Sequence, residues 1–146
     1  MTTAQPLEDI AHVIQLSIAP VFLLTAIGTL LGVLSTRLAR IVDRARVLHD
    51  RAPVRPESAR AQVPGELHIL AQRRHLVNTA ITFGVSAALL VCLLIATAFV
   101  GSIFRAHLGV LIAVLFILAM VALVGALVSF LREIFVAVGS VEIEVR

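Results

Sequence analysis

The sequence predicts an all-α integral membrane protein with three transmembrane helices, the first two of which extend into a cytoplasmic antiparallel helical hairpin. Its composition is the first reason: 60% of its 146 residues are hydrophobic and 14% are charged, whereas a soluble domain carries about 25% charged residues. The second reason is that residues 10–36, 75–103 and 106–131 contain no Asp, Glu, Lys or Arg. Each stretch exceeds the roughly 18 apolar residues that mark a spanning helix. The third reason is the one-sided placement of the arginines.

The first helix is predicted to begin near Pro6, because proline suits the first helical position and Glu8 and Asp9 favour the positive end of the helix dipole. Residues 1–15 form its outer, interfacial start, and residues 16–36 form the first span, with a kink at Pro20. No glycine or proline interrupts residues 33–50, so the helix is expected to continue into water to about Asp50. The N-terminus lacks the basic region of a signal peptide, so we expect this helix to remain in the mature protein.

A proline-rich linker separates the first two helices. Residues 51–65 contain Pro53, Pro56, Pro64 and Gly65, which disfavour helix. The remaining segments are predicted as one continuous membrane domain over residues 1–146: hairpin helices at 37–50 and 66–77, a second span at 78–103, an outer turn at 104–107, a third span at 108–131 and a cytoplasmic tail at 132–146. The tail ends in GSVEIEVR, which alternates apolar and acidic residues and is expected to be a short strand or a frayed end.

The arginines set the predicted orientation. All twelve basic residues are arginine, and only Arg105 lies on the side of the outer turn. Cytoplasmic loops of membrane proteins carry an excess of Lys and Arg. We therefore expect an N-terminus outside and a cytoplasmic linker and tail.

Arg37, Arg40 and Arg44 lie at i, i+3 and i+7, so they share one helix face. Several interpretations stay open: anchoring to anionic headgroups of the inner leaflet, ion pairing in the hairpin with Asp43 as the hub, a specific lipid headgroup site, or an anion-preferring ring in an oligomer. The candidate contacts with lipid or anions are Arg37, Arg40, Asp43, Arg44, Arg46, Arg73 and Arg74.

Small residues recur on each span, and small residues let helices approach closely in lipid. The candidate helix-packing residues are Gly28, Gly32 and Thr36 in the first span, Ala80, Gly84 and Ala88 in the second, and Pro20 at the expected kink. Packing within one chain and packing between copies in a homo-oligomer both stay open.

No pattern in the chain indicates a catalytic, cofactor or metal site. The predicted membrane centres hold no ionisable residue, which argues against a proton relay, an intramembrane protease or a coupled carrier. Glu133 beside Arg132 is interpreted as an interfacial ion pair rather than a general base. His49, His68 and His75 lack the usual spacing of zinc ligands, and a single cysteine, Cys92, excludes an internal disulfide.

Three segments resemble a known family. RLARIVDRAR at 37–46, ELHILAQRRHLVNTAI at 66–81 and FLREI at 130–134 are similar to the bacterial membrane-protein family catalogued as domain of unknown function 2721. The resemblance implies a small three-helix bacterial membrane protein. It implies no activity and no functional residue, and the tail after Ile134 is expected to lie beyond it.

The sequence therefore favours a non-enzymatic inner-membrane protein that works through contacts with other helices and with anionic lipids, as an accessory or assembly factor. The alternative is a homo-oligomeric, anion-preferring channel with an arginine-lined cytoplasmic mouth. Membrane lipids are the expected partners, a nucleic acid is not, and no protein partner can be named.

Overall fold

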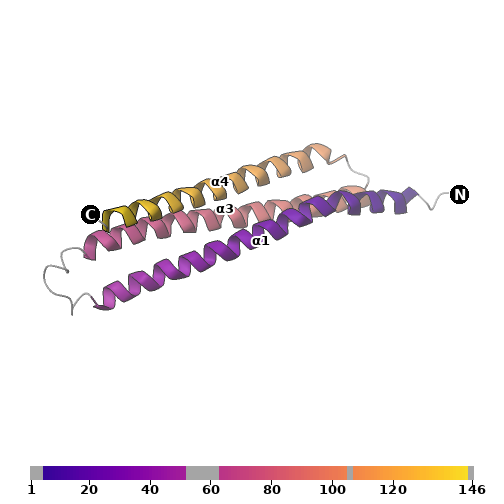
Figure 1. Ribbon diagram of the computed structural model, residues 1–146. Helices are drawn as coiled ribbons and strands as arrows, with labels where there is room; N and C mark the ends of the chain where they lie inside the picture. The colour runs from indigo at the N-terminus through magenta and orange to yellow at the C-terminus, as the bar shows by residue number, and fades with distance from the viewer. Residues whose placement is uncertain (1–4, 52–62, 105–106, 145–146) are drawn as a thin grey trace. The chain divides into compact units, whose positions relative to one another are not determined.

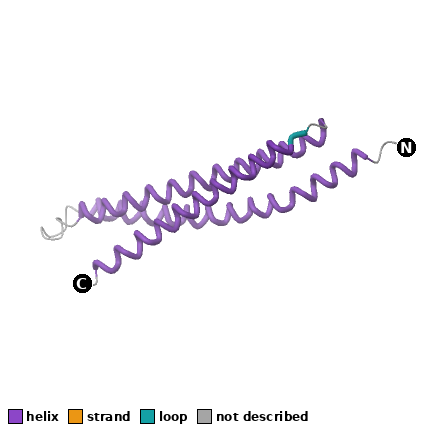
Figure 2. The backbone as a smooth tube through the Cα atoms, turned by 90° about the horizontal axis from the view of Figure 1, so that it is seen from above, coloured by secondary structure: helices purple, strands orange, loops and turns teal. Residues whose placement is uncertain are grey.

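Three long helices make up the part of the chain that the computed structural model describes, residues 5–51, 63–104 and 107–144. They are α1 (Gln5–Arg51), α3 (Val63–Phe104) and α4 (Gly109–Glu144) (Figure 1). The described residues contain no strand (Figure 2). The predicted all-α class is confirmed.

Helix α1 runs without interruption past its apolar stretch, as predicted, and Pro20 lies inside it. Its threonines bond to the backbone of the preceding turn: the hydroxyl of Thr25 donates to Val21 O at 3.3 Å, and that of Thr29 donates to Thr25 O at 3.0 Å. A hydroxyl satisfied in this way needs no water or partner helix. The predicted kink at Pro20 stays a prediction.

Helix α3 begins three residues earlier than the sequence indicated, at Val63 rather than Glu66. Pro64 and Gly65 therefore belong to its first turn and not to the linker. Proline is tolerated there because the N–H that it lacks has no partner inside the helix. Most of the predicted linker lies outside the described residues.

The turn between α3 and α4 falls at the predicted place. Helix α3 ends at Phe104, and α4 starts with Ile112 N–H donating to Leu108 O at 3.0 Å. The expectation for the tail is wrong, because α4 continues to Glu144 and includes most of GSVEIEVR. Extending an existing helix adds one backbone hydrogen bond for each residue fixed. This gain outweighs the strand preference of an alternating pattern that is only two or three pairs long.

Each helix is long and apolar enough to cross a membrane, over Ser17–Asp50, Leu67–Phe104 and Gly109–Val138. Within the most apolar window of each stretch, only 11%, 22% and 17% of the residues are buried. The remaining apolar side chains face outward, where lipid removes them from water. These are the properties of a multi-pass membrane protein.

The chain divides into two compact units, and each contains parts of all three helices. Unit 1 comprises Met1–Leu30 and Phe83–Val124, and unit 2 comprises Leu31–Thr82 and Gly125–Arg146. The buried residues of unit 1 include Ile27, Ala87, Val91, Leu94, Ala119 and Ala122. Those of unit 2 include Leu34, Ile41, Leu48, Leu70, Val77, Ala80, Ala126 and Glu133.

Buried positions repeat every seven residues along each helix, as in Leu34, Ile41 and Leu48 of α1. This spacing is the coiled-coil repeat, in which one seam of side chains enters holes on neighbouring helices. Among the residues of unit 2 whose burial the structure describes, one buried member of the repeat is charged, Glu133 of α4.

Candidate functional site

Glu133 is the centre of an ionic cluster in unit 2. Its side chain is 0% exposed and is held by two arginines that are distant in sequence. Arg37 of α1 donates from Nη1 to Oε2 at 2.8 Å. Arg73 of α3 donates to Oε1 from Nη2 at 2.9 Å and from Nε at 3.2 Å. Both carboxylate oxygens thus accept charge-assisted hydrogen bonds, which is what a buried charge needs to be tolerated.

The two arginines are less buried than the carboxylate that they share. Their side chains are 39% exposed for Arg37 and 24% exposed for Arg73. The guanidinium carbon of Arg37 also lies 5.1 Å from the centre of the Phe130 ring, a cation–π distance. The cluster therefore joins α1, α3 and α4 through the buried carboxylate of Glu133. Its two arginines remain partly exposed.

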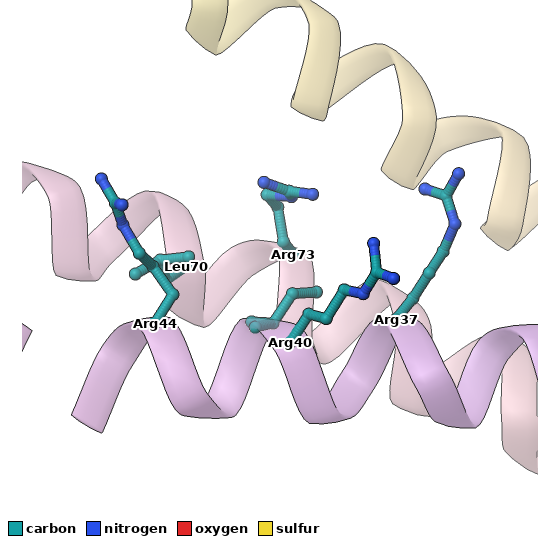
Figure 3. A pocket seen from close by; sticks show the side chains of 6 residues that line it. Arg37, Arg40, Arg44, Leu70 and Arg73 are labelled. Carbon is teal, nitrogen blue, oxygen red and sulfur yellow. The ribbon is translucent and has the colours of Figure 1, made fainter. Parts of the chain in front are cut away.

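These arginines also line a cavity of about 320 Å³ in unit 2. Its lining residues are Arg37, Arg40, Ile41, Arg44, Leu70 and Arg73. Figure 3 shows the side chains of Arg37, Arg40 and Arg44 rising from one side of α1, with Arg73 of α3 among them. The predicted shared face of the three α1 arginines is thus one wall of this cavity.

Arg40 and Arg44 differ from the other two arginines of the cavity. Both are exposed, and neither has an ion-pair partner among the described side chains. Guanidinium groups stay charged in proteins and only donate hydrogen bonds. The lining arginines therefore offer the charge and the donors that an anion needs, and none of the described lining residues is suited to accept a proton.

The other candidate contacts lie outside this cavity. Asp43, Arg46 and Arg74 are exposed and do not line it. Asp43 was one hypothesis for the hub of ion pairing. Among the described residues the acidic partner in both ion pairs is Glu133 instead. Asp43 has a short side chain on the exposed face of α1, whereas Glu133 points into the core.

The interpretation of Glu133 as the partner of Arg132 needs the same correction. Adjacent residues on a helix do not face each other, and Arg132 is exposed while Glu133 is buried. The sequence motifs did not indicate Glu133 as the centre of the cluster. A signal was present, because Glu133 follows Ala119 and Ala126 at intervals of seven and so falls on the buried seam of α4.

The small residues fall into two groups. Ala80 and Gly84 of α3 are buried, and Ala88 is half-buried. Gly28, Gly32 and Thr36 of α1 are exposed, and a Cβ added at either glycine would meet no atom within 4 Å. No neighbouring helix of the described chain therefore packs closely on these two glycines. Pro20 is half-buried.

Comparison with known proteins identifies a family and no activity. A family model described as a protein of unknown function, DUF2721, matches residues 17–143. The match thus extends past Ile134 and takes in most of the tail, contrary to expectation. No curated protein matches the chain, and no solved structure matches it. The match covers most of the chain, so the chain belongs to the DUF2721 family of proteins of unknown function.

Proposed function

We propose that this chain is a non-enzymatic protein of the bacterial inner membrane that binds anionic lipid headgroups and packs against other membrane helices, as an accessory or assembly factor. One observation carries this proposal: four arginines line one cavity, and two of them, Arg40 and Arg44, have no acidic partner among the described side chains. Basic groups near an anionic membrane surface contribute about 1 kcal/mol each.

The position of the arginines in the chain supports a headgroup ligand. Arg37 is the first charged residue after the apolar stretch 10–36. In the proposed topology the N-terminus is outside, residues 37–50 and 66–77 form a cytoplasmic hairpin, and the C-terminal part of α4 joins it. The cavity then lies where the first span leaves the inner leaflet, at the depth of the lipid phosphates.

The chemistry of the cluster supports binding rather than catalysis. Glu133 is the carboxylate that contacts the cavity arginines Arg37 and Arg73, and it is fully buried with both oxygens accepting hydrogen bonds. A general base must reach the proton that it removes, and this carboxylate is turned away from the solvent side of the cluster. Purified protein with a turnover activity that Arg40→Ala abolishes would contradict this part of the proposal.

A pair of matched double variants tests lipid binding at the cavity. Arg40→Ala with Arg44→Ala removes two cavity arginines, while Arg46→Ala with Arg74→Ala removes two exposed arginines outside it. Both variants lower the net charge equally, so a general surface attraction would fall equally in both. We expect native mass spectrometry of protein released from nanodiscs to show fewer retained anionic lipids only for the cavity variant. Equal retention in the two variants would reject the cavity as the lipid site.

A homo-oligomeric anion channel is the second candidate, and the open glycine face of α1 favours it. Gly28 and Gly32 are exposed with free space around them, and such a face suits close packing between copies. Arg37 is paired with Glu133. The arginines that line the mouth of the channel would therefore be Arg40 and Arg44. A closed ring of four or more subunits by native mass spectrometry, with anion flux lost on Arg40→Glu, would support the channel. A monomer would exclude it, because three spans cannot enclose a pore, and a dimer would exclude the ring of four or more subunits that this candidate requires.

A further inference from the structure

We propose that the arginine cavity of unit 2 binds a phosphate group carrying two or more negative charges, that is, a phosphomonoester or a diphosphate, in preference to a phosphodiester. This inference rests on the proposed function and names the class of headgroup that the same site takes. It is carried by three properties of the cavity: its charge, its free hydrogen-bond donors and its apolar floor.

The charge of the cavity exceeds that of a phosphodiester. Four arginines line it, and Glu133 neutralises one positive charge through Arg37 and Arg73. The difference, four minus one, leaves three positive charges. A phosphodiester carries one negative charge and would leave two positive charges side by side. A phosphomonoester carries about −1.5 to −2 at neutral pH, and a diphosphate carries at least as much, so either compensates the cavity better.

The donors left free by Glu133 match an oxyanion with several terminal oxygens. Arg37 uses Nη1 on Glu133, and Arg73 uses Nε and Nη2. Each guanidinium has five N–H donors in a planar fork, so donors remain on both, and those of Arg40 and Arg44 have no side-chain acceptor among the described residues. A phosphomonoester offers three terminal oxygens and a diphosphate offers more, whereas a phosphodiester offers two. Each added guanidinium–oxygen pair is a charge-assisted hydrogen bond.

The floor of the cavity fits a ligand with a hydrocarbon part close to the phosphate. This floor consists of the two apolar lining residues, Ile41 and Leu70, and both are buried. The volume of about 320 Å³ lies at the lower end of the range for ligand pockets. It accommodates a headgroup rather than a large soluble cofactor. The phosphate can belong to a lipid or to a free anion, and the experiment separates these two sources.

The test compares lipids of equal total charge. Nanodiscs of a zwitterionic lipid receive either a phosphatidic acid, which is a phosphomonoester, or a phosphatidylglycerol, which is a phosphodiester, with the amounts adjusted to the same charge. Native mass spectrometry then counts the lipids that the released protein retains. We expect a preference of about tenfold for the phosphomonoester, equivalent to about 1.4 kcal/mol. We expect Arg40→Ala with Arg44→Ala to abolish this preference and Arg46→Ala with Arg74→Ala to keep it.

A second arm omits added lipid. Inorganic diphosphate is titrated into the protein in detergent, and binding is measured by isothermal titration calorimetry. Binding of diphosphate that the cavity variant loses supports a free anion as a ligand. Phosphomonoester preference without diphosphate binding supports the lipid as the source.

Equal retention of the two lipids by the wild-type protein, with no diphosphate binding, overturns the inference. If the cavity variant then still loses both lipids, the proposed function survives and only the headgroup class is wrong. If both double variants retain lipid like the wild type, the proposed function fails as well.

Discussion

The two compact units draw on the same three helices but bury different chemistry. In unit 1 the buried positions include apolar residues such as Val91 and Leu94 and alanines such as Ala119. In unit 2 the same seven-residue series of α4 continues from Ala126 to Glu133, which meets Arg37 and Arg73. One helix thus supplies a methyl group to one core and a carboxylate to the other.

The alanines of unit 1 and the carboxylate of unit 2 have different effects: the alanines allow close packing, and the carboxylate gives specificity. Alanines let helix backbones approach, and van der Waals contact is what drives helix association in lipid. An alanine seam, however, tolerates a shift along the helix. A buried carboxylate that needs two guanidinium partners fixes which turn of α4 meets which turns of α1 and α3, as polar core residues fix register in coiled coils.

The difference also bears on where each unit lies. A charged group at the centre of a bilayer costs about 2.5–3.5 kcal/mol on insertion scales. The buried positions named for unit 1 are apolar, and Phe22, Leu89 and Val121 are among its exposed apolar residues. Unit 2 contains the buried Glu133 with Arg37 and Arg73, whose side chains are 39% and 24% exposed. This cost favours the proposed placement of the Glu133 cluster at the headgroups rather than at the bilayer centre.

Glu133→Ala should have the largest effect on stability. It leaves Arg37 and Arg73 without their carboxylate, and because the two arginines are 39% and 24% exposed, we expect the lower end of the cost of breaking a buried ion pair, about 3 kcal/mol. The measurement is the free energy of unfolding in detergent micelles, followed by circular dichroism. Arg132→Ala, at the exposed neighbouring position, is the control and should change stability by less than about 0.5 kcal/mol. Equal losses of stability in Glu133→Ala and Arg132→Ala would contradict the role of a buried carboxylate in the core of unit 2.

The triple variant Arg37→Leu, Arg73→Leu and Glu133→Leu sharpens the same contrast. Replacing a whole buried ionic cluster by apolar residues is often neutral or stabilising. We therefore expect this variant to recover most of the stability that Glu133→Ala loses, measured in the same micelles. A triple variant as unstable as the single one would show that the cluster does more than satisfy its own charges.

Arg73→Ala should have the next largest effect. Arg73 makes two hydrogen bonds to Glu133 and is the less exposed of the two arginines. Losing hydrogen bonds to a charged group costs about 1.5–3 kcal/mol. Arg74→Ala removes the same charge from the next residue, which is exposed, so it is the matched control in the same unfolding measurement. A loss as large for Arg74→Ala would contradict the assignment of Arg73 to the core of unit 2.

Much of the fold was readable from the sequence because lipid imposes simple rules on it. An apolar stretch of sufficient length can cross lipid only as a helix or as part of a closed barrel, and residues 10–36 leave little choice. The errors fell at helix ends, at Val63 and in the tail. Those positions lie outside the apolar stretches, where proline and alternating residues give weaker signals than continuous hydrophobicity.

The candidate site was predictable in part. The spacing of Arg37, Arg40 and Arg44 places them on one face of a helix whatever the tertiary structure, and the cavity contains all three. The partner of Arg37 lies 96 residues away, and local spacing carries no information at that distance. Asp43 was the nearest carboxylate in sequence and was therefore the wrong choice of hub. Only the seven-residue seam of α4 pointed to Glu133.

Phe130→Leu should have a smaller effect. The ring lies beneath the guanidinium group of Arg37, at 5.1 Å, and leucine keeps an apolar surface there but loses the cation–π contact. A cation–π contact at a partly exposed site contributes up to about 1 kcal/mol. Phe135→Leu, an exposed phenylalanine of the same helix, is the control in the unfolding measurement. An equal loss in the two variants would mean that the ring contributes apolar area alone.

Gly28→Ala and Gly32→Ala should have the smallest effect on the single chain, and the same effect in both units. A Cβ at either position meets no atom within 4 Å, and alanine in a helix is favoured over glycine by about 0.5 kcal/mol. Unfolding in micelles should therefore show unchanged or slightly raised stability. The subunit count by native mass spectrometry should fall if copies of the chain pack through these glycines, because a methyl group separates the two backbones. A clear loss of monomer stability would contradict the exposed position of the two glycines. An unchanged count would leave the channel without the interface that favours it, and the exposed face of α1 would then be covered by lipid or by a different protein.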